Sequence, residues 1–354
     1  MFNKKRVVLF LVWLIIISLM LSTILAIVAS ADTPIQLNNV ADIKTVQEED
    51  LTTITISAAG DVTMGRDALT SYYNTFDHEV ALQKKDYSYF MKNVKPIFEN
   101  DDLTIVNLEG PLTNSTLMAE KQFRFKGTAA YTEVLKQGSI EAVNLANNHM
   151  FDYLDQGYFD TVSNLSEANI GYFGFEHKYL TEVKGIKVGM LGFAGWDMGK
   201  QKKEDIKKAV DDLKSKGANL IIASFHWGEE RKYTPNQTQK ELGRYCIDIG
   251  VDLVLGHHPH VIQGIETYKG KSIVYSLGNF SFGGNKNPSD KDAYIYQHSF
   301  SYKDNVLQME TGQVIPVSIS SSKARNNYQP TPLQDIEAYR VMNKIRKYSM
   351  NLRN

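Results

Sequence analysis

Residues 251–261 have the sequence Val-Asp-Leu-Val-Leu-Gly-His-His-Pro-His-Val. The mostly apolar run at the start of this stretch is typical of a buried strand, and a glycine ends it. His257, His258 and His260 follow at once. A single histidine in such a place is more often a surface group, but neutral imidazole is also the commonest metal ligand. Three histidines crowded at the end of one strand therefore favour a metal site.

Other predicted strands also end in side chains that can bind metal. They are followed by Asp61 (strand at residues 53–58), Glu109 (103–108), Asn148 and His149 (140–145), and His226 (219–225). Helical patterns alternate with these strands from residue 53 to residue 280, which predicts an α/β sheet. Ligands of open α/β sheets bind beyond the carboxyl ends of the strands, so we expect these side chains to meet at one edge.

Carboxylates, an amide and imidazoles together suit a pair of divalent metal ions, although they do not distinguish Mn, Fe, Zn or Mg. Two ions about 3.5–4 Å apart clamp the attacking and leaving oxygens of a displacement and lower the pKa of bound water to about 7. Glu109 is expected to bridge the two ions. The full set of expected ligands is Asp61, Glu109, Asn148, His226, His258 and His260.

Several further residues are expected to face a substrate. His149 directly follows Asn148 and is a candidate general acid. Arg66 is a candidate for holding an anionic oxygen, with a surface salt bridge as the equally good alternative. The remaining residues expected at the substrate are Asn147, Trp227, His257 and Asn279.

The composition is that of a globular protein. The chain has 354 residues, of which 43% are hydrophobic and 22% charged, and its net charge is -1 at pH 7. This length suits one large domain or two ordinary ones. The near-neutral charge gives no indication of a nucleic-acid partner. Cys246 is the single cysteine, which excludes a disulfide within the chain.

The N-terminal region predicts a membrane anchor. Residues 7–28 carry no charged side chain and, at 1.5 Å per residue, would span roughly 30 Å of hydrocarbon. Lys4, Lys5 and Arg6 precede them, so the short N-terminus is expected in the cytoplasm and the rest of the chain outside the cell. Residues 29–31, Ala-Ser-Ala, also resemble a signal-peptidase site, and a cleaved segment would export the domain as well.

Four parts of the chain are expected. They are a cytoplasmic tip with the anchor (residues 1–31), a polar linker (32–52), the main domain (53–320) and a C-terminal amphipathic helix (321–354). Thr331-Pro-Leu-Gln334 has the residues of a helix start, with Thr as cap and Pro in the first turn. That helix is expected to pack against the domain or against a partner.

The order of the motifs resembles the CapA family, also called PgsA, of membrane-anchored proteins in poly-γ-glutamate capsule synthesis. The motifs are Gly60-Asp-Val-Thr-Met-Gly-Arg66, Asn107-Leu-Glu-Gly-Pro-Leu112, Ala146-Asn-Asn-His149, His226-Trp-Gly228, Gly256-His-His-Pro-His-Val261 and Tyr275-Ser-Leu-Gly-Asn-Phe280. They cover residues 54–282 without a break in order. The resemblance implies a layered α/β sandwich of the calcineurin-like metallophosphoesterase type. It also implies that the membrane ligase and export subunits of poly-γ-glutamate synthesis are partners.

Two positions depart from the usual metallophosphoesterase motifs. Thr63 stands where the first motif normally has a histidine, and Glu109 stands where the second normally has an aspartate. One ion is therefore expected to lack a ligand or to be absent. The fold that the resemblance implies follows more directly than phosphoesterase activity does.

Two functions stay open at this point. One is a metal-dependent exported hydrolase acting on a phosphoester, or on an amide of the γ-glutamyl polymer or of the cell wall. The other is a non-enzymatic scaffold that binds the anionic polymer and assembles the synthase complex. Both make the protein a cell-membrane component, with a single span, of capsule synthesis and export.

Overall fold

The computed structural model describes residues 51–350 and residue 352. They belong to the second of two units of the chain, Asp50–Asn354. The predicted cytoplasmic tip, the anchor at residues 7–28 and nearly all of the predicted linker lie outside the described residues. Among the residues that are described, no helix combines the length and apolar character needed to cross a bilayer.

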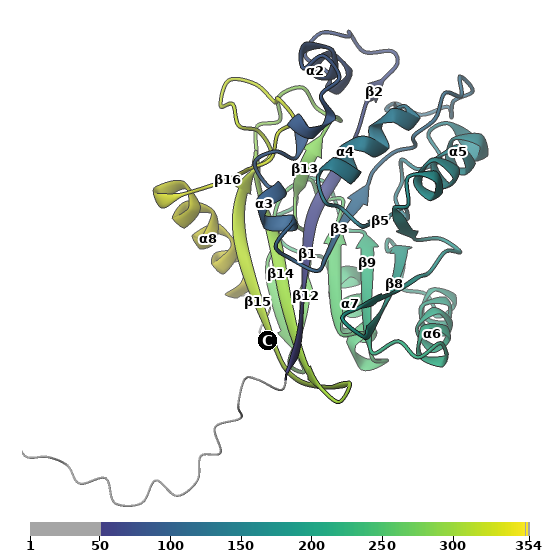
Figure 1. The fold of residues 1–354 in the computed structure, drawn as a ribbon, viewed down its shortest axis with the longest axis vertical. Coiled ribbons are helices and arrows are strands. Elements are labelled where there is room, and N and C mark those ends of the chain that lie inside the picture. The colour runs from purple at the N-terminus through teal and green to yellow at the C-terminus, as the bar shows by residue number, and fades with distance from the viewer. Residues whose placement is uncertain (1–50, 351, 353–354) are drawn as a thin grey trace, which may run out of the picture. The chain divides into compact units, whose positions relative to one another are not determined.

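A large mixed sheet forms one half of the structure (Figure 1). Seven of its eight strands have the order β16-β15-β14-β1-β3-β5-β6, and β13 pairs with β1. The strands are β1 (Thr52–Thr63), β3 (Leu103–Leu108), β5 (Ala142–Asn144), β6 (Gly171–Phe173), β13 (Asn279–Phe282), β14 (Asp292–Lys303), β15 (Val306–Ser318) and β16 (Thr331–Pro332). The strands β1, β3, β5 and β6 run parallel, whereas β14 and β15 form an antiparallel ribbon on the other side of β1.

The second sheet has six strands in the order β11-β12-β10-β9-β8-β7. They are β7 (Tyr179–Val183), β8 (Ile186–Ala194), β9 (Leu220–His226), β10 (Leu253–His257), β11 (Ile265–Tyr268) and β12 (Lys271–Val274). The strands β8, β9, β10 and β12 are parallel. Every residue of β9 and β10 is buried, which agrees with their continuous apolar runs, because parallel strands are covered on both faces. A separate ribbon pairs β2 (Arg66–Asp67) with β4 (Phe125–Lys126).

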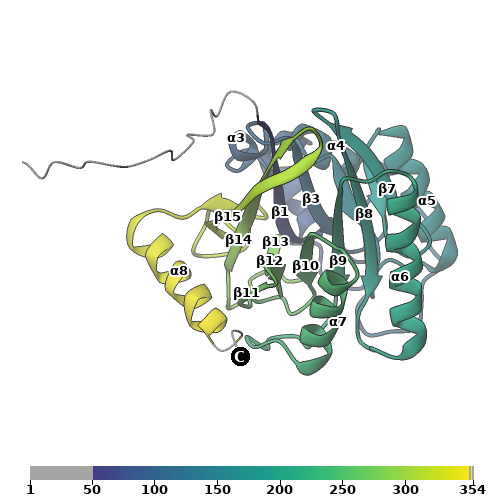
Figure 2. The same cartoon turned by 90° about the horizontal axis from the view of Figure 1, so that it is seen from below.

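The two sheets pack face to face, and helices cover their outer faces (Figures 1 and 2). A core of side chains from both sheets, such as Ile56, Ile105, Ile222 and Leu255, fills the space between them. The helices on the outer face of the large sheet are α2 (Phe76–Leu82), α3 (Lys95–Phe98), α4 (Thr132–Gln137) and α5 (Leu154–Glu167), with two short 3₁₀ turns at Tyr87–Phe90 and Ala129–Tyr131. Those on the second sheet are α6 (Lys200–Ser215) and α7 (Gln237–Asp248). This arrangement confirms the predicted α/β class.

The local sequence explains why two of the helices that pack on the second sheet form where they do. The charged helix α6 buries only Ile206, Val210 and Leu213, which recur at helical spacing on one face. The helix α7 begins at a capping box, in which Asn236 and Gln239 satisfy each other's backbone amides.

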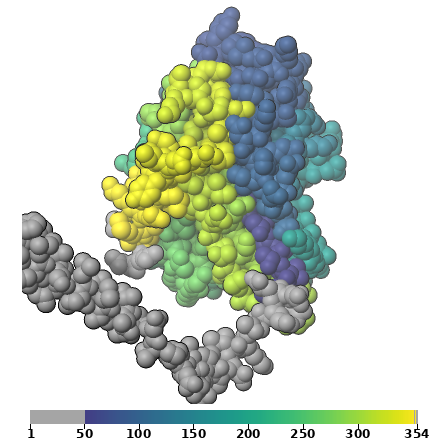
Figure 3. Space-filling model, turned by 60° about the vertical axis from the view of Figure 1, so that its left-hand side comes forward, coloured from purple at the N-terminus to yellow at the C-terminus, as the bar shows by residue number. Residues whose placement is uncertain are grey.

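The C-terminal segment packs onto this frame. The helix α8 (Asp335–Met350) lies beside β15 and buries Val341 and Ile345 in the core between the sheets (Figure 2). The segment before it crosses to the N-terminal third of the domain (Figure 3), where Asn93 Nδ2 donates to Thr331 Oγ1 over 2.9 Å. Thr331 lies in β16, and α8 starts at Asp335, three residues after the first helical position that the cap motif predicts.

The carboxyl ends of the central strands of both sheets meet at one place. In the large sheet Asp61 of β1 is in register with Asn107 of β3. In the second sheet His226 of β9 is in register with His257 of β10. His226 and Asn107 also approach each other across the gap between the sheets, with 3.2 Å between their side-chain nitrogens. The predicted convergence at one sheet edge is therefore a convergence of two sheet edges.

Candidate metal centre

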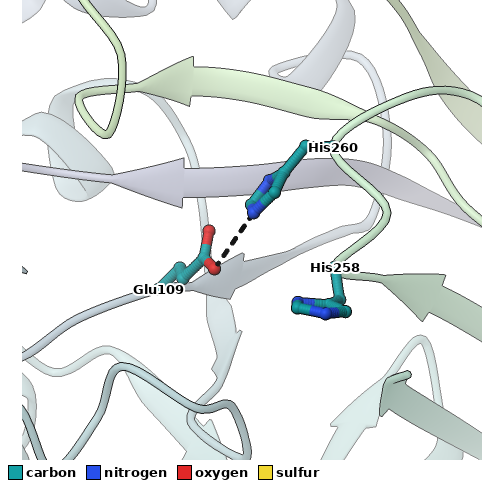
Figure 4. A group of neighbouring side chains, drawn as sticks. All are labelled: Glu109, His258 and His260. Atoms are coloured by element: carbon teal, nitrogen blue, oxygen red, sulfur yellow. Dashed lines mark ion pairs between the residues drawn. The ribbon is translucent and has the colours of Figure 1, made fainter. Parts of the chain in front are cut away.

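Glu109, His258 and His260 form the centre of the site (Figure 4). Each offers one ligand atom, and these atoms lie within 4.8 Å of one another. The carboxylate of Glu109 points at the His260 ring, with 3.7 Å between Oε1 and Nε2, while His258 lies beside them. His226 closes the group from the second sheet, its Nε2 lying 3.5 Å from Glu109 Oε1. Four expected ligands from both sheets therefore meet.

Asp61 adjoins this group on the side of the large sheet. Its side chain is fully buried, and its Oδ1 accepts a hydrogen bond from Asn107 Nδ2 over 2.8 Å. Its Oδ2 lies 3.2 Å from His260 Nδ1 and accepts a longer bond, 3.3 Å, from the backbone amide of His258. Asp61 thus shares His260 with Glu109, and the two carboxylates face one imidazole.

The protonation states follow from burial and from this pairing. Burial lowers the pKa of His258 to about 4, with the charge of His260 adding to the effect, and it holds the pKa of His226 well below 6.5. Burial also disfavours charge on His260, but Glu109 and Asp61 outweigh it and raise its pKa to about 10. Burial raises the pKa of Glu109 to about 7. His226 and His258 are thus neutral imidazoles, the form that binds metal.

The donor set fits a divalent cation. Glu109 Oε1 is buried and has no hydrogen-bond partner among the described residues. An unpaired buried carboxylate oxygen is costly unless it is paired or coordinates a metal. When Asp61 and Glu109 are both ionised, the single imidazolium of His260 leaves one negative charge without compensation. A divalent cation held by Glu109, His258 and His260 would balance the two carboxylates, with His260 releasing its extra proton as it becomes a ligand. Carboxylate with imidazole suits Zn, Mn or Fe.

The loop that carries the two histidines is strained. His258 has a φ of 94° and His260 a φ of 55°, a region that residues other than glycine rarely adopt. Between them lies Pro259, whose carbonyl accepts a 2.8 Å hydrogen bond from the backbone amide of Arg231. Strained backbone of this kind persists where the surrounding structure fixes it, and it is frequent at functional sites.

His149 lies at the rim of the centre and is held by other groups. Its Nδ1 is 2.7 Å from Asp152 Oδ2, which also accepts a hydrogen bond from the amide of Phe125. Asp152 is fully buried and pairs through its other oxygen with Lys121. The second ring nitrogen of His149 makes no hydrogen bond within the described part of the chain. The imidazole is therefore held in one orientation with one nitrogen available.

Of the two neighbouring asparagines, Asn147 and not Asn148 is the buried one. The side chain of Asn147 is buried, and its Nδ2 donates to the carbonyl of Leu108 over 2.8 Å, directly before Glu109. Its Oδ1 accepts from the backbone amide of His149, which closes a tight turn. That turn directs the next residue outward, so Asn148 is exposed and the structure does not bring its side chain to the group.

Three other expected site residues do not reach the centre. Arg66 forms an ion pair with Asp77, 3.1 Å between Nε and Oδ2, which corresponds to the salt-bridge alternative. Trp227 is wholly buried and donates to the carbonyl of Tyr275, because the residue after His226 points to the opposite face of the sheet. His257 is buried behind Asp61, and both its ring nitrogens lack a hydrogen-bond partner in the described residues. Arg66 and Trp227 therefore lie away from the ligand group, whereas His257 approaches Asp61, with 3.6 Å between Nδ1 and Oδ1. Contact of these three residues with a substrate stays a prediction.

Asn279 does reach the site. Its Oδ1 lies 2.9 Å from His260 Nδ1, and its Nδ2 donates to the carbonyl of the same residue. Asn107 and Asp152 are functional neighbours that the sequence did not single out. Asn107 is within one of the quoted motifs, two residues before Glu109, and Asp152 follows His149 by three residues. The position of an aspartate three residues after the candidate acid His149 is the only feature of the sequence that could have indicated Asp152.

A cavity of about 250 Å³ opens beside the centre. His149, His260 and Asn279 contribute to its wall. Because a candidate ligand and the candidate acid border the same space, a substrate in this cavity would contact both.

Comparisons with known proteins agree with the motif order. The model of the family "Bacterial capsule synthesis protein PGA_cap" matches residues 55–284. The capsule biosynthesis protein CapA of Bacillus anthracis is 29% identical over 340 residues, 85% of this chain and 78% of the relative. The PGA biosynthesis protein CapA of Bacillus subtilis (strain 168) is 30% identical over 267 residues, 69% of this chain and 67% of the relative. A solved structure described as a novel phosphatase of Mycoplasma pneumoniae covers 75% of this chain and 94% of its own, with 15% identity and a TM-score of 0.44.

The match to the family model extends over more than half of the chain, and it includes every motif from the strand before Asp61 to the strand that carries Asn279. Both CapA relatives cover at least two thirds of this chain and of their own length. The chain therefore belongs to the bacterial capsule synthesis family PGA_cap.

Proposed function

We propose that this protein is a divalent-metal-dependent hydrolase in poly-γ-glutamate capsule synthesis, exported and held at the cell membrane by residues 7–28. The observation that supports hydrolysis most is the meeting of Glu109 with His226, His258 and His260 from the other sheet, while Glu109 Oε1 accepts no hydrogen bond from the described residues. The two stacked sheets with helices outside them support a metallophosphoesterase-type sandwich. The names of the two CapA relatives support the pathway.

In this proposal Glu109, His258 and His260 hold one ion, and Asp61 with His226 supplies ligands to the same ion or to a second one. When bound, the metal would lower the pKa of a water molecule and polarise the bond to be cleaved. The chain's own contribution is to orient the ligands: Asn107 holds Asp61, Asn279 holds His260, and Thr63 Oγ1 donates to the second oxygen of Glu109 over 3.2 Å. Such outer partners fix the direction of metal ligands.

His149 is proposed as the general acid. The Nδ1–H group of His149 donates a hydrogen bond to Asp152, which fixes the ring plane. When the ring is protonated on both nitrogens, Nε2 is therefore the one that gives its proton to the leaving group. The leaving group is the oxygen of a phosphoester or the nitrogen of an amide. Among the polymers in question, an amide of poly-γ-glutamate is the substrate that the relatives' names favour.

The membrane synthase and export subunits are the proposed partners, because a polymer must reach a protein whose domain lies outside the cell. The scaffold alternative makes a different prediction about the same residues. A scaffold that only binds polymer needs the anchor and the sandwich but not the metal ligands.

The test combines metal analysis with turnover. The full-length chain is purified, its bound metal is measured, and hydrolysis of a generic phosphodiester and of γ-linked oligoglutamate is followed. Glu109→Ala and His226→Ala are expected to lose metal and at least a hundredfold in turnover, whereas Arg66→Gln serves as a matched control outside the centre. Absence of metal from the wild-type protein, or equal turnover in all variants, contradicts a hydrolase. Normal capsule in cells that carry the two ligand variants, but not in cells that lack the anchor, would then support the scaffold.

A further inference from the structure

The cavity beside the metal centre also has aromatic lining residues that take no part in the proposed hydrolysis. Phe123 and Phe125 line it together with His149, His260 and Asn279, and the centroids of the Phe125 and His149 rings are 4.7 Å apart. Phe123 is 53% exposed, and its ring stacks on that of Phe125 with 6.5 Å between their centroids. At about 250 Å³ the cavity is near the lower end of ligand pockets, which run roughly from 300 to 1,000 Å³. It therefore suits one segment of a chain whose scissile bond lies at the metals.

Arg231 borders the same cavity and is the cation best placed to recognise an anionic group there. It follows His226 by five residues, and its backbone amide is hydrogen-bonded to the carbonyl of Pro259, between the two ligand histidines. Its φ of 61° keeps the backbone in the left-handed region. The residue is exposed, and its guanidinium has no hydrogen bond or ion pair within the described part of the chain. Its backbone is thus fixed to the histidine loop while its charge is free.

The acidic residues around the cavity leave Arg231 available. Asp290 accepts hydrogen bonds from Lys344, over 2.6 Å, and from the hydroxyl of Tyr233, over 2.8 Å. Glu230 lies next to Arg231 in the chain and also borders the cavity, and no ion pair joins the two among the described residues. Arg66, the arginine that the sequence favoured for holding an anion, is occupied by Asp77.

We infer that this cavity is a subsite for the carboxylate-bearing unit adjacent to the cleaved bond, and that Arg231 is the residue that selects the carboxylate. The guanidinium donates two parallel N–H bonds to the two carboxylate oxygens, a geometry that a lysine cannot reproduce. The rings of Phe123 and Phe125 hold the methylene part of the same unit. The inference rests on the proposed function for the identity of the polymer, but it concerns binding and not cleavage.

Binding of short γ-linked oligoglutamate to the full-length chain, measured by calorimetry, tests this assignment. The same oligomer with its α-carboxylates converted to carboxamides is measured in parallel, together with phenyl phosphate. Arg231→Gln is expected to weaken binding of the carboxylate form about tenfold, with little change for the carboxamide form, and Arg231→Lys to recover only part of the loss. Glu230→Gln should bind the oligomer at least as tightly as wild type, and Arg66→Gln should bind it equally well.

Three results would overturn the assignment. They are an unchanged affinity in Arg231→Gln, an equal loss for the carboxylate and carboxamide oligomers, and an effect on phenyl phosphate alone. Glu109→Ala separates this test from that of the proposed function, because it removes cleavage but leaves the subsite. If the wild-type protein binds the oligomer through Arg231 but does not hydrolyse it, the subsite is supported and the hydrolase is refuted. If hydrolysis occurs and does not depend on Arg231, the hydrolase is supported and the subsite is refuted.

Discussion

Glu109→Gln should make the metal-free protein more stable at alkaline pH. In the fold, Glu109 and Asp61 share one imidazolium, His260, and burial raises the pKa of Glu109 from its ordinary 4.5 to about 7. That rise corresponds to a free-energy cost of roughly 3 kcal/mol for the ionised carboxylate. Glutamine keeps the size of the side chain and leaves Asp61 paired with His260 as a neutral pair. The pKa of about 7 already includes the attraction to His260, so we expect a net gain in unfolding free energy of about 1–3 kcal/mol.

The pH dependence fixes the sign of this effect. Between pH 4.5 and about 7 the unfolded chain has already released the Glu109 proton while the folded chain still holds it, so wild-type stability falls as the pH rises through this window. Below pH 4.5 the carboxyl is neutral in both states and the variant has no advantage. Above about pH 7 the advantage is complete.

Urea denaturation at pH 4.5 and pH 8, with chelator present, measures the difference. Saturating metal should reverse the order at pH 8, since a ligand at a thousand times its dissociation constant stabilises the wild type by about 4.1 kcal/mol and the variant by much less. A Glu109→Gln protein that is no more stable than wild type at pH 8 in chelator would refute the reasoning. An advantage of equal size at both pH values would also refute it.

The remaining predictions concern residues around the centre. Arg66→Ala should leave turnover within about twofold of wild type, because its guanidinium pairs with Asp77 outside the centre; a larger loss would return Arg66 to the site. Asp152→Asn should lower kcat by about 10- to 100-fold with unchanged metal content, because His149 loses the acceptor that orients it. A folded variant with the kcat of the wild type would contradict the assignment of His149 as the general acid. Trp227→Phe should lower the unfolding free energy by roughly 1–3 kcal/mol without changing KM, since the indole is buried and hydrogen-bonded. A raised KM with unchanged stability would instead indicate that Trp227 contacts the substrate.

The sequence predicts where the strands end, and this was enough to indicate the centre. Apolar runs stop just before Asp61, Glu109 and His226, and parallel strands bring their carboxyl ends together. The predicted end at residue 108 is that of β3, whereas β1 continues to Thr63 and β9 to His226. The sequence could not show that the carboxyl ends of these strands belong to two different sheets. Strand periodicity gives the length and the faces of a strand but not its neighbours, and His226 meets Glu109 only because the sheets pack face to face.

The orientation of single side chains in turns was also beyond the sequence. Asn147 and Asn148 have the same side chain. Only the turn in which the His149 amide donates to the side-chain oxygen Oδ1 of Asn147 decides which of the two points inward. Trp227 follows a ligand residue, but its position in an extended segment sends it to the opposite face.

The helix start at the C-terminus shows tertiary structure overriding a local signal. Thr331 and Pro332 have the composition of a cap and a first turn, but both pair with β15, and α8 begins only at Asp335. The hydroxyl of Thr331 donates to the carbonyl of Gln329 and accepts from Asn93, so it is not available as a cap. The predicted anchor at residues 7–28 stays a prediction, since it lies outside the described residues.

Anomalous diffraction from a crystal of the protein grown with Mn²⁺ would locate a bound ion. We expect an anomalous peak about 2.0–2.2 Å from an oxygen of Glu109 and from a ring nitrogen of His258 and of His260. The peak should disappear in Glu109→Gln crystals. Density without a peak at this point under saturating Mn²⁺, or a peak bound only by residues elsewhere on the surface, would contradict the proposed metal centre.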